Sequence, residues 1–376
     1  MIDQRGLRHF DFILLLLAAA LVAYGAILIY SASLSAYPDG MTLGHPLVKQ
    51  IMFAAAGLAI SIGVAWLDYR MWGQMAPALY ALSVFLLIAV LFVGDSAYGS
   101  TRWFSFAGQQ IQASEIAKIL VIVTLARFMA DHQHEMQDIR VFLTTLVMAA
   151  VPAGLVMIEP DLGTAMVFGA AWLGMVLIAG APLRFALVLI GLAVSLIPFA
   201  TLAVMGDYQR ERFANWIDPN HDPLGGGFNI LQSEIGIGSG GIFGKGLTEG
   251  TQTQLDFLQT STTDYIFSVL GEELGLMGAV ILFSLFVLLL FRGIRAASIS
   301  QDPFGRLLAT GIVIMILFQT FINVAVNIRL LPVTGIPLPF VSQGGSSLIT
   351  LLVGIGILQS VVLRHRRPTF RDFFDS

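Results

Sequence analysis

The strongest constraint on this chain is a series of long apolar stretches without charged residues. A helix needs roughly 20 apolar residues to cross the hydrocarbon core of a bilayer. Only 12% of the residues are charged, about half of the ~25% typical of soluble domains. The sequence therefore predicts an all-α polytopic membrane protein and argues against a soluble enzyme. Nine stretches qualify, near residues 12–32, 50–67, 71–94, 141–158, 162–181, 185–205, 274–291, 307–327 and 343–363.

A tenth stretch, near 112–130, carries three charged residues and fails a strict hydropathy test. Including it gives about ten helices with both termini cytoplasmic, and places thirteen of the twenty Lys and Arg residues on the cytoplasmic side. This agrees with the positive-inside bias. Without it, the basic cluster at 364–371 would lie opposite Arg5 and Arg8. We therefore expect a single transmembrane domain over residues 1–376, with an uncleaved first span. Six cations fall outside: Lys49, Arg102, Arg210, Arg212, Lys245 and Arg329.

The largest element outside the spans runs from about 206 to 263, between helices seven and eight on the outer face. It contains too many apolar residues for a solvated tether, so we expect it to fold back onto the helices and carry the functional site. Its segment Gly236–Gly246 matches a nucleotide-binding pattern by letter but has no preceding strand. Two interpretations remain: a glycine backbone that approaches phosphate together with Lys245, or a series of tight turns with positive φ.

Charged and amide residues also occur within the predicted spans. Glu115 and Lys118 are spaced i, i+3, so they can pair on one helix face. Such a pair is either a structural ion pair or the polar wall of a cavity. A stripe of Gln319, Asn323 and Asn327 at i, i+4, i+8 favours hydrogen bonds between helices, with cavity lining as the second interpretation.

Three acidic clusters lie near predicted helix ends. Asp264 stands where the outer loop enters the eighth helix, as an N-cap or as a carboxylate open to substrate. Asp161 follows Glu159 and Pro160, and capping of the next helix is its favoured role. The segment 131–135 resembles a metal cluster, but a solvated loop between helices is the favoured interpretation.

Ordered motifs occur along nearly the whole chain. They include Arg102-Trp-Phe, Gln112-Ala-Ser-Glu115-Ile-Ala-Lys118, Asp161-Leu-Gly-Thr164, Tyr208-Gln-Arg210-Glu-Arg212, Gly244-Lys-Gly246, Thr263-Asp264-Tyr-Ile-Phe267 and Gly344-Gly-Ser-Ser347. Together these motifs resemble the SEDS family (shape, elongation, division and sporulation). The family pattern before the aspartate is usually L-P-E-x-H-T-D, whereas this chain has an atypical segment, Gln259–Thr262, before Thr263 and Asp264. Two further motifs, at 222–225 and 250–252, are similar to elongation-type rather than division-type members.

This resemblance implies a peptidoglycan glycosyltransferase that polymerises lipid II on the outer face of the bacterial cytoplasmic membrane. A class B penicillin-binding protein would be its transpeptidase partner, alongside elongation-complex proteins. Asp264 would be the general base, and Glu115 and Lys118 would shape the polar end of the lipid groove. A divalent cation, Mg²⁺ or Mn²⁺, stays open as a cofactor, with no ligands named. The cations expected to meet the pyrophosphate charge are Arg102, Arg210, Arg212 and Lys245.

Two other functions remain open at this stage: a lipid II flippase or other transporter, and a scaffold that recruits partners. Transporters often show internal repeats and broken helices that meet at the midplane, whereas polar residues here gather at the outer face. The net charge of −4 and the lack of a basic patch argue against nucleic acid as a partner.

Overall fold

The computed structural model describes residues 10–37, 41–97, 100–106, 109–203, 206–222 and 225–364. This part of the chain contains ten long helices, which confirms the predicted all-α membrane fold. Seven of them meet length and composition criteria for a membrane span. The ten helices are α2 (Phe12–Ser33), α3 (Pro46–Trp66), α5 (Ala76–Val93), α6 (Ala113–Asp131), α7 (Ile139–Ile158), α8 (Leu162–Ile178), α9 (Leu183–Ala203), α13 (Ile266–Ile299), α14 (Pro303–Asn327) and α15 (Gly345–Leu363).

The ends of these helices follow local sequence signals. Asp161 caps α8, since its carboxylate accepts from the Thr164 N–H at 3.0 Å, which confirms the predicted capping role. Asp302 caps α14 in the same way, and Pro303 occupies the first turn, where its missing N–H costs nothing. A short helix, α4 (Tyr69–Gln74), precedes α5.

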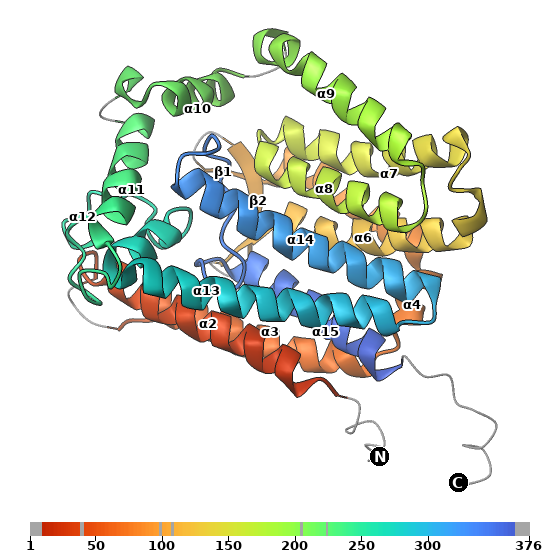
Figure 1. Cartoon of the computed structure of the whole chain (residues 1–376), viewed down its shortest axis with the longest axis horizontal. Coiled ribbons are helices and arrows are strands. Elements are labelled where there is room, and N and C mark those ends of the chain that lie inside the picture. The colour runs from red at the N-terminus through yellow and green to blue at the C-terminus, as the bar shows by residue number, and fades with distance from the viewer. Residues whose placement is uncertain are drawn as a thin grey trace, which may run out of the picture.

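The helices form a bundle in which α14 and α15 are central (Figure 1). In each of these two helices about three quarters of an apolar 18-residue stretch is buried inside the protein. The buried share of the corresponding stretch is only 28% in α3, α5 and α7. The outer helices therefore present apolar side chains to the lipid. The side chains of Arg292 on α13 and Gln359 on α15 both bond to Asp11 beside the start of α2. The start of α2 and the end of α15 therefore lie at the same end of the bundle, as an even number of membrane spans requires.

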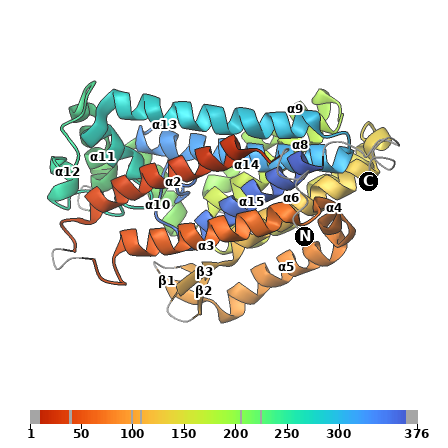
Figure 2. The same ribbon diagram turned by 90° about the horizontal axis from the view of Figure 1, so that it is seen from below.

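A small antiparallel sheet lies beside α5 at the edge of the bundle (Figure 2). Its strands are β1 (Asp95–Ala97), β2 (Ser100–Phe106) and β3 (Gln109–Gln112), in the order β1-β2-β3. In β2 and β3, Trp103 is paired with Gln112 and Phe104 with Ile111. This sheet is not predicted from the sequence, because its strands are short and follow directly on an apolar span.

The segment from 206 to 263 is largely helical and folds back onto the bundle as predicted. It forms α10 (Asp207–Ile217), a 3₁₀ turn η2 (Pro219–His221), α11 (Gly226–Gly240) and α12 (Thr251–Gln254). Helix α11 packs along the outer part of α13 (Figure 1). The Cβ that a side chain would add at Gly240 would lie 1.9 Å from the Gly271 carbonyl oxygen, so this contact requires glycine.

Helix α13 is longer than the predicted span at 274–291 and is broken at Gly275, which has φ 62° and ψ −157°. The break leaves backbone groups without their helical partners, and the segment after α11 supplies new ones. The Leu276 and Met277 N–H groups donate to the carbonyls of residues 241 and 242, both at 3.0 Å. In return, the Lys245 and Gly246 N–H groups donate to the carbonyls of residues 272 and 273, both at 3.0 Å. The glycine-rich segment therefore supplies hydrogen-bond partners to the backbone groups of α13 on both sides of the break.

Candidate active site

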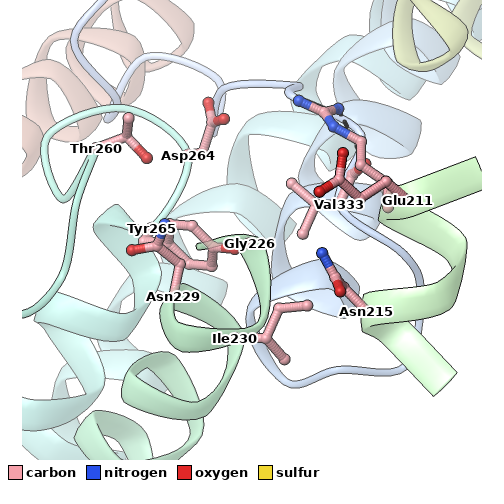
Figure 3. Close-up of a pocket in the computed structure, with 10 residues that line it drawn as sticks. Glu211, Asn215, Gly226, Asn229, Ile230, Thr260, Asp264, Tyr265 and Val333 are labelled. Atoms are coloured by element: carbon pink, nitrogen blue, oxygen red, sulfur yellow. Dashed lines mark hydrogen bonds between the residues drawn. The ribbon is translucent and has the colours of Figure 1, made fainter. Parts of the chain in front are cut away.

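A cavity of about 300 Å³ opens where α10, α11, the approach to α13 and the segment after α14 meet. Most of its lining side chains are polar. Figure 3 shows Asp264 and Thr260 at one edge of this group, with Asn215 and Ile230 at the other. The lining residues are Glu211, Arg212, Asn215, Gly226, Asn229, Ile230, Thr260, Asp264, Tyr265 and Val333.

The backbone that leads into Asp264 is fixed at three consecutive carbonyl groups. Each accepts a hydrogen bond from a residue far away in the sequence, so the turn is held in one conformation. This explains how the atypical segment before Asp264 is kept in place without the Pro, Glu and His of the family pattern. The donors are the Gln343 N–H to Thr262 O (2.8 Å), the Ser342 hydroxyl to Thr263 O (2.5 Å), and the Asn323 and Asn327 amides to Asp264 O (3.1 and 2.9 Å).

The Asp264 side chain does not cap α13, so the capping alternative is wrong. The N-cap position is Tyr265, and no side chain bonds to the first turn there. Among the residues that the structure describes, none donates a hydrogen bond to the Asp264 carboxylate, which is half-buried at the cavity wall. It therefore remains available to a ligand.

The surroundings of Asp264 raise its pKa above the ordinary value of an aspartate. Burial is the largest cause, because it disfavours the charged form. The Arg212 guanidinium opposes this shift, Asp161 adds to it, and Arg102 opposes it more weakly. A carboxylate with a raised pKa is a stronger base than an exposed one, which favours proton abstraction.

The predicted cations are only partly brought together. Arg212 lines the cavity and donates to the Val333 carbonyl at 3.0 Å. Arg102 is buried on β2, and its Nε donates to the Glu159 carbonyl at 2.8 Å, so it holds the turn between α7 and α8. Arg210 lies exposed on α10, outside the cavity lining.

Glu159, at this α7–α8 turn, is fully buried, and neither of its carboxylate oxygens has a hydrogen-bond partner among the described residues. Burial and the nearby Asp161 raise the pKa of Glu159 to about 8. At neutral pH this side chain is therefore mainly a neutral acid, which explains how it can be buried beside another carboxylate.

Glu115 and Lys118 form the predicted ion pair on α6. The Lys118 ammonium lies 2.7 Å from the Glu115 carboxylate, and both side chains are almost inaccessible. The second Glu115 oxygen has no hydrogen-bond partner in the part of the chain that the structure describes. Neither residue lines the cavity around Asp264, so a role at the polar end of a lipid groove remains a prediction.

Lys245 lies in a separate cluster, where its ammonium contacts the Glu272 carboxylate at 2.7 Å and the Thr251 hydroxyl at 2.9 Å. The turn interpretation is confirmed for the second half of the glycine-rich segment by positive φ at Gly241, Gly244 and Gly246. The first half, up to Gly240, is helical instead and belongs to α11. The phosphate interpretation loses its main donors, because the N–H groups of residues 245 and 246 are bonded to α13.

No group of three or more His, Asp or Glu side chains is placed to hold a metal ion in the part of the chain that the structure describes. The described residues therefore offer no acidic or histidine ligand set for the divalent cation that the sequence leaves open. In the segment at 131–135, Asp131 pairs with Arg127 at 2.9 Å, and both side chains are 45% exposed. This agrees with the solvated-loop interpretation.

Comparison with known families identifies the chain. Residues 11–367 match the FtsW/RodA/SpoVE family model, described as a cell cycle protein. The chain belongs to this family. These are the SEDS proteins that the motifs predicted.

Two curated relatives of the family show how close the match is. The chain is 40% identical over 353 residues to the peptidoglycan glycosyltransferase MrdB of Escherichia coli, covering 94% of this chain and 93% of that protein. It is 38% identical over 371 residues to a probable peptidoglycan glycosyltransferase FtsW of Geobacter metallireducens, covering 96% and 97%. The two identities are similar, so they do not separate elongation-type from division-type members.

Solved structures of the family share this fold. A chain from a peptidoglycan synthase complex that coordinates polymerization and crosslinking is 30% identical and matches with a TM-score of 0.80, covering 96% of this chain and 99% of that one. The rod shape determining protein RodA of Thermus thermophilus is also 30% identical, with a TM-score of 0.68 and coverage of 95% and 96%. The chain therefore shares its fold with solved members of the SEDS family.

Sequence reasoning missed several residues that line the cavity, among them Glu211, Asn215, Asn229 and Thr260. Their only shared signal is their position in the outer segment, which was expected to carry the site. Their convergence depends on how α10 and α11 pack, and no periodic pattern in the sequence specifies that packing.

Proposed function

We infer that this chain is a peptidoglycan glycosyltransferase that polymerises lipid II, with Asp264 as the general base. The observation that carries the proposal is the Asp264 carboxylate: it lines a polar cavity, its backbone is fixed, and no described side chain bonds to it. Membership of the SEDS family and similarity to proteins named peptidoglycan glycosyltransferases support the reaction class.

The proposed reaction joins an acceptor sugar to a donor sugar carried on undecaprenyl pyrophosphate. The acceptor hydroxyl donates its proton to the Asp264 carboxylate while its oxygen forms a bond to the anomeric carbon of the donor. The bond from that carbon to the pyrophosphate oxygen breaks, and its electron pair leaves with the pyrophosphate. Because this leaving group is already a stable anion, it needs positive charge more than a general acid.

The positive charge closest to this step comes from Arg212, which lines the same cavity. Arg102 contributes at longer range, since its charge already lowers the pKa of Asp264. Arg210, which directly precedes the lining residues Glu211 and Arg212 on α10, is the further candidate for the pyrophosphate. Preorganised cations of this kind stabilise the charge that develops on the leaving group.

The substrate and the partner follow from the same reading. Lipid II would reach the cavity from the bilayer, with its prenyl chain among the apolar helices and its sugars at the outer face of the bacterial cytoplasmic membrane. A class B penicillin-binding protein would crosslink the product, as the likeness to a peptidoglycan synthase complex suggests. We place this chain in cell elongation on the motif versions at 222–225 and 250–252; a division role is the alternative.

A lipid II flippase is the second candidate, because the buried pair of Glu115 and Lys118 suits a transport path. Purified chain with a class B penicillin-binding partner and fluorescent lipid II separates the two functions. The proposal expects glycan ladders in detergent, where there is no membrane to cross. Transfer of lipid II across vesicle membranes without any ladder would instead establish the flippase.

A further inference from the structure

The first turn of α13 contains a side-chain amide where a helical hydrogen bond would normally form. In a regular helix the Ser268 N–H would donate to the carbonyl of Asp264, four residues earlier. Here the Ser268 N–H donates to Asn327 Oδ1 at 3.1 Å, while Asn327 Nδ2 donates to the Asp264 carbonyl at 2.9 Å. The amide of Asn327 thus stands between the two groups and replaces their direct bond.

The Asn327 amide thus forms a bridge between the Ser268 N–H and the Asp264 carbonyl, and this bridge keeps Asp264 outside α13. With the amide inserted, the helix begins after Tyr265, and the Asp264 side chain is directed to the cavity wall rather than to the free N–H groups of the first turn. Were the amide absent, the Ser268 N–H would keep only its bond to the Tyr265 carbonyl (3.0 Å), and the Asp264 carbonyl only the bond from the Asn323 amide (3.1 Å). A direct bond from the Ser268 N–H to the Asp264 carbonyl would then complete the helical pattern and draw Asp264 into the first turn of α13.

The bridge is itself fixed by contacts on three helices. Asn327 is 1% exposed, and its Oδ1 also accepts from the Ser268 hydroxyl at 2.7 Å. The Ser268 hydroxyl lies 2.5 Å from the hydroxyl of Ser233 on α11, which in turn donates to the Asn327 carbonyl at 2.8 Å. Asn323, one turn earlier on α14, adds a second donor to the Asp264 carbonyl at 3.1 Å. The network therefore leaves the amide of Asn327 one orientation.

From these contacts we propose that Asn327 is a positioning residue for the glycosyl transfer: its amide holds Asp264 out of α13 and directs the carboxylate to the acceptor hydroxyl. The inference rests on the proposed function, in which Asp264 is the base. The charged groups around that carboxylate are Arg212 on α10, Asp161 before α8 and Arg102 on β2. Among the described residues none of them is hydrogen-bonded to the bridge, so an uncharged substitution at Asn327 acts on Asp264 through the backbone.

The test compares Asn327→Leu with a matched control, Gln319→Met, in the full chain with its class B penicillin-binding partner. Gln319 lies two turns earlier on the same helix, is equally buried, and makes no contact with Asp264. For Asn327→Leu we expect kcat to fall about 10-fold or more, with KM changed less than about 3-fold, since positioning acts on the chemical step. The control should keep both values.

The pH dependence gives the readout that a merely structural role would not produce. In Asn327→Leu the Asp264 carboxylate would move toward the N–H groups of α13, which stabilise its charged form. The acidic limb of the profile of kcat against pH should therefore move to lower pH by a few tenths of a unit. Asn327→Asp, of equal size, loses the donor to Asp264 and adds a negative charge, so its limb should move to higher pH. This second variant carries the test if the first does not fold.

Infrared titration of the Asp264 carboxyl, identified by subtraction of Asp264→Asn, reports the same shifts without any turnover. It therefore separates this inference from the proposed function: an inactive wild type would remove the function, whereas the two opposite shifts would still establish the bridge. Folded Asn327 variants with unchanged kcat and unchanged Asp264 pKa would overturn it, as would a loss confined to KM.

Discussion

Two carboxylates on the same stretch of chain, Asp264 and Glu272, lie in opposite environments. Glu272 accepts hydrogen bonds on both oxygens and is 1% exposed. Asp264 accepts none on its carboxylate from the described residues, and lines a cavity. The donors to Glu272 are the Lys245 ammonium (2.7 Å), the Thr251 hydroxyl (3.1 Å), the Gln252 N–H (3.0 Å), and the Thr253 N–H and hydroxyl (3.3 and 3.2 Å).

The difference distinguishes a carboxylate that stabilises the fold from one that is available for catalysis. The saturated carboxylate of Glu272 fastens α12 and the segment around Lys245 to α13, close to the break at Gly275. The carboxylate of Asp264 has its backbone fixed and its oxygens free, which is the arrangement that a general base requires. By sequence both are acidic residues near the start of one helix, and only their hydrogen bonds distinguish them.

The largest expected effect is that of Asp264→Asn. Loss of the base should reduce glycan polymerisation by about 10²–10⁴-fold, while thermal unfolding in detergent stays close to wild type because no described side chain depends on this carboxylate. Rates are measured with fluorescent lipid II, and folding by the midpoint of thermal unfolding. Wild-type rates in a folded variant would remove Asp264 from the mechanism.

Arg212→Gln should have the next largest effect, with a loss of about 10–10²-fold in kcat, since one cation at the cavity is removed from the developing pyrophosphate charge. The control is Arg329→Gln, whose guanidinium bonds to Glu234 and to the Trp216 carbonyl outside the cavity lining. Equal losses in both variants would mean that Arg212 acts only by holding the outer segment.

Glu272→Gln should reverse the pattern of Asp264→Asn. The protein should lose about 1–3 kcal/mol of stability, because a buried charged acceptor is removed from several donors at once, and kcat should fall less than in Asp264→Asn. The midpoint of thermal unfolding checks the first expectation. An Asp264→Asn protein less stable than Glu272→Gln would contradict the comparison.

Lys245→Gln should have the smallest effect. The Lys245 side chain is 27% exposed, so water screens its ion pair and the stability loss should be about 1 kcal/mol or less. If Lys245 also binds pyrophosphate, as the sequence predicts, KM for lipid II should rise by more than this loss explains. An unchanged KM would leave Lys245 with its structural contact alone.

The helices of this fold could largely be predicted from the sequence, because a bilayer requires about 20 apolar residues for each span. The charged residues of α6 are tolerated because they form two pairs. Glu115 and Lys118 neutralise each other inside the bundle, and Arg127 pairs with Asp131 at the exposed end of the helix. Even so, α13 continues well beyond its apolar core at 274–291. Its outer part is stabilised by α11 and by the segment at 241–246, and hydropathy carries no signal of either contact.

The candidate site was predicted in part. Asp264 and Arg212 do meet at one cavity. Asn323 and Asn327 of the amide stripe form the predicted hydrogen bonds, but their partner is the backbone of Asp264 itself. The Oε1 atom of Gln319 has no partner among the described residues. Lys245 was grouped with the cavity cations by its nearby glycines, and its pairing with Glu272 depends on how the chain folds around Gly275. Such pairings are set by tertiary packing.

The measurement that tests the central claim most directly is the pH dependence of kcat in wild type and Arg212→Gln. Because the base acts only when deprotonated, and burial raises the pKa of Asp264, activity should rise with pH along a limb above the ordinary aspartate value of about 3.9. Removal of Arg212, which lowers this pKa, should move the limb to still higher pH. A limb at the ordinary value, or one that Arg212→Gln leaves in place, would contradict Asp264 as the base.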